Sequence, residues 1–252
     1  MNKTSLLAFI LLIVTSATAF AQQTYLLHQS ARVLDFPTIG INNQFDGNST
    51  YFVGCVEYKV TYSGLSTDVP EQQEKLDFLI ENSSSSYGLK RRHCFNEHGD
   101  WLHIYGDGKH VSKNWYFADT NEEYILFANG VLKYLINDKV SFQELKIARL
   151  ETTGNKKSIL GYDLQQVILE RESGTIVEYW VTSQLLRDPK SYIKNKAAYS
   201  DVVLSKVKGV HLHKRSIVAG MFVTDEEAIN IDEDVSLSEL FILPNVALYK
   251  ME

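Results

Sequence analysis

The chain of 252 residues is poor in cysteine, proline and basic side chains. Its two cysteines are too few for a small disulfide-stapled scaffold, and its four prolines are too few for a collagen-like or polyproline architecture. Lysine and arginine number 25 against 31 aspartates and glutamates, which gives a formal net charge of −6. This balance argues against a general attraction to nucleic acid or to an anionic membrane surface.

The common local signatures of enzymes are also missing. The sequence contains no GxSxG, HExxH, GxGxxG or GxxxxGK[ST] segment, which are typical of hydrolases, zinc peptidases, dinucleotide sites and nucleotide sites. We therefore predict a protein that is not an enzyme, with no catalytic residues, no cofactor and no metal.

The first 21 residues have the pattern of a secretory signal peptide. Lys3 supplies the positive start, Leu6 to Val14 is an unbroken apolar stretch, and Ala19-Phe20-Ala21 is an A-x-A cleavage signal. The apolar stretch is far shorter than the roughly 20 residues that span a bilayer. We expect cleavage after Ala21 and a soluble periplasmic chain without a transmembrane segment.

The rest of the chain predicts one mainly β (α+β) domain. Residues 22–50 are rich in turn residues and are expected to form an extended lead-in to a single domain over residues 51–252. Short runs of alternating apolar and polar residues follow, separated by turn signals such as Asn129-Gly130. Such short connections permit antiparallel pairing and forbid parallel pairing, so we expect an antiparallel sheet.

One helix is predicted after the first strand. Asp68 is placed to cap it, Pro70 lies in its first turn and Glu71 completes a capping box. The pattern predicts that the helix ends before Ser83–Ser86, which reads as a flexible loop.

The strand expected over Tyr51 to Tyr62 carries the candidate ligand-binding residues. Val56, Tyr58, Val60 and Tyr62 alternate along it, so they share one apolar, aromatic face. Such a face predicts either ordinary core packing or one wall of a cavity for a lipid or acyl chain. We select these four residues as candidate ligand-binding residues.

Cys55 and Cys94 are the two cysteines, and alternation places both on the more polar faces of their strands. A disulfide between them is compatible with an exported protein, but their pairing is left open because the sequence does not give the distance between them. A metal site at Cys94, His98 and His103 is disfavoured because these spacings match none of the usual ligand pairs.

Two further groups of polar residues are weighed as metal sites. His211 and His213 alternate on a strand and would share a face, but Arg215 would share it too and would oppose a cation. The acidic segments Asp225–Glu227 and Asp232–Asp234 lack the register of a calcium loop. We therefore interpret both acidic segments as solvated turns.

Several segments, in this order, resemble secreted proteins of Bacteroidota-type bacteria in the LolA/LolB-like superfamily, the outer-membrane lipoprotein carriers and their relatives. The segments that carry the resemblance are Gly54–Val60, Ile159–Asp163, Gly174–Thr182, Gly209–Ile231 and Phe241–Pro244.

The resemblance implies a strongly curved antiparallel sheet that forms an open half-barrel covered by a few helices. It also implies binding of a lipid or a lipoprotein acyl chain on the concave face, in a protein of the cell envelope. The alternative is a structural or protein-interaction module of the envelope that binds no small molecule.

Overall fold

The computed structural model describes residues 51–65, 69–136, 146–196, 200–218 and 221–250. The predicted signal peptide, the whole of the predicted lead-in and Asp68 lie outside these residues. The described strands form one twelve-stranded sheet in the order β12-β6-β5-β4-β3-β2-β1-β11-β10-β9-β8-β7, and it is not closed. The prediction of a mainly β fold built on an antiparallel sheet is therefore confirmed.

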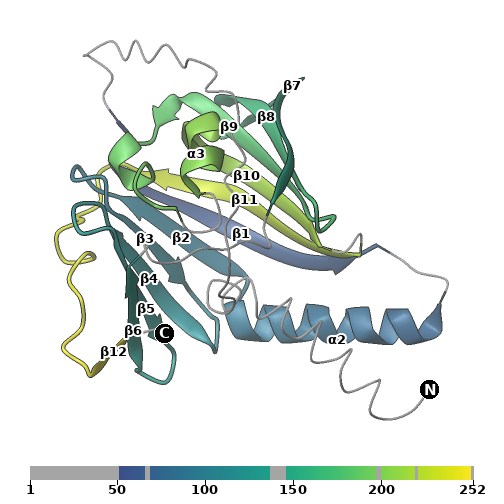
Figure 1. Ribbon diagram of the computed structural model, residues 1–252, viewed down its shortest axis with the longest axis horizontal. Coiled ribbons are helices and arrows are strands. Elements are labelled where there is room, and N and C mark those ends of the chain that lie inside the picture. Colours follow the sequence, from purple (N-terminus) through teal and green to yellow (C-terminus); the bar gives the residue numbers. More distant parts are fainter. Residues whose placement is uncertain (1–50, 66–68, 137–145, 197–199, 219–220, 251–252) are drawn as a thin grey trace.

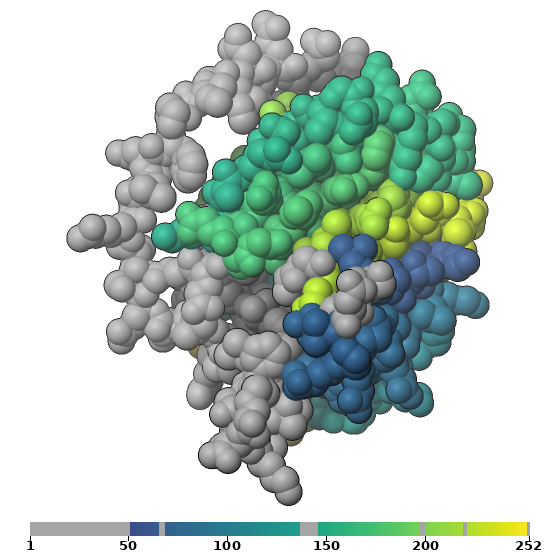
Figure 2. All heavy atoms as spheres, turned by 90° about the vertical axis from the view of Figure 1, so that its right-hand side faces the viewer, coloured from purple at the N-terminus to yellow at the C-terminus, as the bar shows by residue number. Residues whose placement is uncertain are grey.

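The sheet joins strands that are distant in sequence. Between β1 (Gly54–Gly64) and β9 lie two strands from the end of the chain, β11 (Phe222–Asp232) and β10 (Gly209–Val218). Figure 2 shows this as a band of yellow atoms between the purple of β1 and the green of β7 to β9. On the side of β1 away from β11, the next strands in order are β2 (Lys90–Phe95), β3 (Trp101–Tyr105), β4 (Val111–Phe117), β5 (Glu122–Phe127) and β6 (Leu132–Ile136).

On the side of β10 away from β11, the sheet continues with three strands, which are β9 (Ile176–Leu186), β8 (Tyr162–Arg171) and, at the edge, β7 (Ile147–Ile159). All neighbouring strands pair antiparallel except β12 (Leu248–Lys250), which lies parallel to β6. The sequence did not predict β12 because three exposed residues carry no usable alternation.

In the described part of the chain, two α-helices accompany the sheet, and Figure 1 shows how they lie. Helix α2 (Pro70–Tyr87) lies beside β1, and the short helix α3 (Ser200–Val207) contacts β7 and β8. A single 3₁₀ turn, η3 (Pro189–Ser191), follows β9. Among the described residues, we find no helix that is both long and apolar enough to cross a membrane.

The end of α2 differs from the prediction, because Ser83–Ser86 form its last turns and not a loop. Ser83 is buried. The backbone N–H groups of Lys109 and His110 donate to the carbonyls of Ser85 and Ser86 at 3.0 and 2.9 Å. Because a neighbouring loop satisfies the carbonyls at the end of the helix, four residues of modest helix propensity remain helical.

Candidate ligand-binding site

The predicted ligand-binding residues of β1 lie in or beside the core. Val56, Tyr58 and Val60 are each at most 1 % exposed, and Tyr62 is half-buried. The Tyr58 hydroxyl donates to the carbonyl of His211 at 2.6 Å. Their part in ligand binding stays a prediction, and the packing of the first three accounts for their apolar character.

Cys55 and Cys94 form a disulfide. They are direct partners in the register of β1 and β2, and both are fully buried. The expectation that they occupy polar faces is wrong, because a segment near the C-terminus covers this side of the sheet. Leu237, Leu240, Phe241 and Leu243 of that segment pack on the cluster that contains the disulfide.

The two histidines weighed as metal ligands have other contacts in the structure. Within the described ranges, no three His, Cys, Asp or Glu side chains gather in a way that could hold a metal ion. The register shifts between His211 and His213. The His211 ring consequently lies near Glu226, whereas the His213 ring contacts Lys157 and Asp225.

Glu226 lies at the centre of a buried group of ionisable side chains. It contacts the guanidinium of Arg91, and the side chains of Glu226 and Arg91 are 3 % and 14 % exposed. The amine of Lys214 and Nε2 of His211 lie 3.9 and 3.8 Å from its carboxylate oxygens. The interpretation of Asp225–Glu227 as a solvated turn is therefore wrong, since these residues lie within β11.

Neighbouring positive charges determine the protonation state of the Glu226 carboxyl. Burial alone would raise its pKa, but Arg91 and Lys214 outweigh burial and hold that pKa well below 4.5. The carboxylate is ionised at neutral pH and the buried Arg91 is its counterion.

Three histidines adjoin this ion pair. The rings of His93 and His103 stack with centroids 3.8 Å apart, and Tyr58 lies 4.7 Å from His93 and 5.3 Å from His211. Burial lowers the pKa of all three imidazoles below 6.5, well below in the case of His93 and His103. All three are therefore neutral at pH 7.

Several polar atoms of the histidines and Glu226 are buried without a hydrogen bond. Among the described residues, Nδ1 of His93, Nε2 of His211 and Oε2 of Glu226 have no hydrogen-bond partner. None of these residues lines the pocket described next. We interpret this set, together with Arg91 and Lys214, as a pH-sensitive part of the core, and name it the Glu226 cluster.

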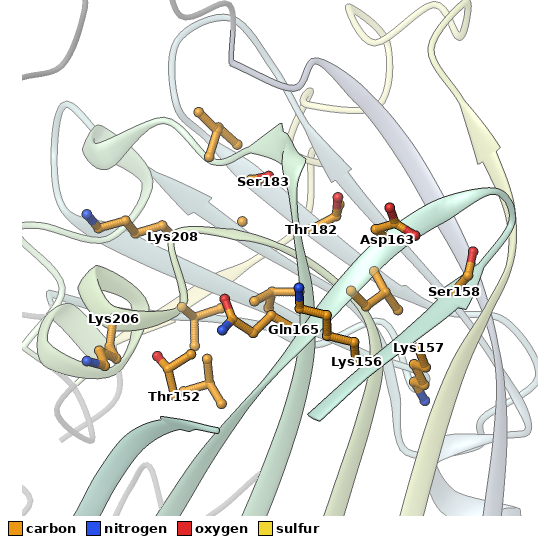
Figure 3. A pocket seen from close by; sticks show the side chains of 16 residues that line it. Thr152, Lys156, Lys157, Ser158, Asp163, Gln165, Thr182, Ser183, Lys206 and Lys208 are labelled. Carbon is orange, nitrogen blue, oxygen red and sulfur yellow. The ribbon is translucent and has the colours of Figure 1, made fainter. Parts of the chain in front are cut away.

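A pocket of about 570 Å³ lies between β7 to β9 and α3 (Figure 3). Its apolar lining is formed by Leu164, Val167, Val181, Leu186 and Val207. Leu164, Val167, Val181 and Val207 are buried. This pocket is a space between the sheet and a covering helix. A cavity of this kind was expected at β1, and the pocket lies instead at β7 to β9.

The rim of the pocket is polar and mostly basic. It includes Lys156, Lys157, Lys206 and Lys208, together with Thr182, Ser183, Gln165 and a single carboxylate, Asp163. Ten of the sixteen described lining residues have polar side chains and five have apolar ones, so this lining is more polar than that of most small-molecule sites. No local pattern in the sequence indicated this pocket, because β7 and α3 are about 50 residues apart and neither segment carries a motif.

The comparisons with known proteins leave the family unassigned. No family model and no curated protein matches the chain. Two solved structures, "Structure of PNGF-II in C2 space group" and "Structure of PNGF-II in P21 space group", are similar at 14% identity and a TM-score of 0.41. In each case the match covers 77% of this chain and 31% of that chain. A TM-score of this size assigns neither a shared family nor a shared function.

Proposed function

We propose that residues 22–252 form a secreted, periplasmic, non-catalytic protein that binds an apolar ligand, a lipid or acyl chain, between the sheet and α3. The pocket of about 570 Å³ between β7 to β9 and α3 carries this proposal. Its volume is within the roughly 300–1,000 Å³ of small-molecule sites.

The apolar lining favours a long chain over a short one. Each buried methylene contributes about 0.8 kcal/mol, whereas association costs about 4–15 kcal/mol of lost freedom. Half a dozen sheltered methylenes contribute about 5 kcal/mol, which only reaches the lower end of that cost. A ligand that occupies this pocket stably therefore needs an acyl chain and further polar contacts.

Two features support the remaining parts of the proposal. The Cys55–Cys94 disulfide suits an oxidising compartment such as the periplasm, in line with the predicted signal peptide. The resemblance to the lipoprotein carriers supports a strongly curved, half-barrel sheet and an acyl ligand.

The alternative is a protein-interaction module of the cell envelope. Exposed apolar side chains near the C-terminus favour it, with Ile242 at 66 %, Leu248 at 49 % and Tyr249 at 54 % exposure. Exposed apolar groups that cluster are typical of docking surfaces.

Binding of a pyrene-labelled fatty alcohol, followed by fluorescence, tests the proposed site. Ser183 lines the pocket from an exposed position, whereas the equally exposed Gln184 does not line it. Ser183→Trp should fill the entrance and reduce binding at least about tenfold, which corresponds to 1.4 kcal/mol. Gln184→Trp is the matched control and should bind like the parent protein.

Two results would overturn the proposal. If the parent protein binds neither the fatty alcohol nor the matching fatty acid, or if both tryptophan variants bind equally well, the pocket is not the site and the interaction module becomes the better explanation. Reproducible turnover of ester, phosphate or glycoside substrates, abolished by one polar substitution, would overturn its non-catalytic part.

A further inference from the structure

The pocket beside α3 is basic in a protein that is acidic as a whole. Four lysines and one aspartate line it, while the chain has a formal net charge of −6. A local excess of positive charge around a pocket attracts anions and orients them.

Among the described residues, none of the four lysines has an acidic partner within 4.0 Å. The amine of Lys157 contacts the His213 ring and lies 4.5 Å from the centroid of the Trp180 ring. For Lys156, Lys206 and Lys208, no carboxylate of the described residues lies within 4.0 Å of the amine. By contrast, Lys196 of the neighbouring loop pairs with Asp201 at 2.6 Å.

The charges are distributed unevenly around the pocket. In Figure 3 Lys206 and Lys208 lie at the α3 side, whereas Asp163 and Ser158 lie at the opposite side, near the β7–β8 turn. Asp163, the only carboxylate among the described lining residues, is thus remote from the two lysines, and the α3 side is the favourable place for a negative charge.

The backbone at Lys208 supplies an independent observation. Its φ is +56°, in the left-handed region that residues with a Cβ atom rarely adopt and that Gly or Asn commonly occupies after a helix. Two hydrogen bonds hold it there, from the Lys208 N–H to Leu204 at 2.7 Å and from the Arg187 N–H to Lys208 at 3.0 Å. A lysine at such a position costs more folding free energy than Gly or Asn would, and Asn121 and Leu160 also adopt this region.

We propose that this pocket recognises an anionic headgroup, a carboxylate or a phosphate, through the amines of Lys156, Lys206 and Lys208. The inference rests on the proposed function, since the same pocket shelters the apolar chain. Lysine is a compact point charge with three donors, and it binds either oxyanion without a fixed bidentate geometry.

A pair of probes with the same pyrene-labelled chain tests the headgroup. The fatty acid should bind about tenfold or more tightly than the fatty alcohol at low salt, and this advantage should shrink as salt screens the charges. Competition by unlabelled dodecanoate and by dodecyl phosphate then shows which oxyanion is preferred. Dodecyltrimethylammonium should compete no better than a neutral dodecyl maltoside.

Lys208→Asn separates recognition from folding. Asn has no charge and accepts the left-handed backbone, so this variant should be as stable as the parent protein or more stable. Its affinity for the fatty acid should fall about three- to tenfold, with no change for the alcohol. Lys109→Asn, at an exposed position outside the pocket, should change neither affinity.

The outcomes distinguish the two proposals. Equal affinity for acid and alcohol would overturn the anionic headgroup and leave the apolar site intact, whereas absence of binding for both probes would overturn the proposed function itself. A Lys208→Asn variant that loses acid and alcohol binding equally would show that Lys208 acts through shape, and would also overturn the inference.

Discussion

The imidazole rings of His93 and His103 stack with centroids 3.8 Å apart, on adjacent strands β2 and β3. Two stacked imidazoles cannot both be protonated without strong repulsion, and burial lowers the pKa of each well below 6.5. The stack therefore requires neutral rings.

This requirement predicts a loss of stability on mild acidification. Below about pH 6.5 the unfolded chain binds protons at these histidines and the folded chain does not, so the free energy of unfolding falls as pH falls. Each histidine that stays neutral to about pH 5 contributes a loss of up to about 2 kcal/mol. Urea unfolding between these pH values measures the effect.

His103→Gln provides the comparison for this pH dependence. The variant lacks one titrating ring and should show a shallower decline than the parent protein over the same range. Parent stability that stays constant from about pH 6.5 to 5 would contradict the assignment of neutral, buried histidines.

The Arg91–Glu226 pair predicts a large single-site effect. Glu226→Gln leaves the guanidinium of Arg91 buried without its counterion, and we expect a loss of about 3 kcal/mol or more in the free energy of unfolding. Glu57→Gln is the matched control, because Glu57 is 41 % exposed and lies 3.7 Å from Arg92. An exposed pair contributes less than about 1 kcal/mol, so equal losses in the two variants would contradict the central role of Glu226.

The Cys55–Cys94 disulfide predicts sensitivity to reductant. It closes a loop with a sequence separation of 39, for which the chain-entropy relation gives about 4 kcal/mol. Thermal unfolding with and without a reducing agent should show this loss in the parent protein. The double variant Cys55→Ala, Cys94→Ala should match the reduced parent and should not respond to the reductant; a response would mean that the reductant acts elsewhere.

Two neighbouring residues of the C-terminal segment should differ in their contribution to stability. Phe241 packs on the cluster around the disulfide and Trp115, whereas Ile242 is 66 % exposed. Phe241→Ala should lower the free energy of unfolding by about 1–3 kcal/mol, and Ile242→Ala should change it by less than about 0.5 kcal/mol. Chemical unfolding monitored by tryptophan fluorescence compares them, and similar losses would contradict the packing of this segment.

Local pattern predicted much of the fold because period-2 alternation and turn residues act over a few positions. Val56, Tyr58 and Val60 share a buried face as their spacing indicated. The same local rules failed at Ser83–Ser86, where the loop at Lys109 and His110 keeps the serines helical. They failed again at Cys55 and Cys94. The alternation of residues in these strands indicates a polar face, but a segment more than 130 residues from Cys94 along the chain covers and buries that face.

The strand-rich class, the antiparallel pairing and the apolar face of β1 follow from local sequence pattern, since each depends on side chains that are neighbours in the chain. The Glu226 cluster and the pocket beside α3 arise instead from contacts between distant segments. Arg91 meets Glu226 across 135 positions, and Lys156 and Lys208 reach one pocket from β7 and from the turn after α3. Such encounters depend on strand order and register, and no local pattern of polar residues encodes them.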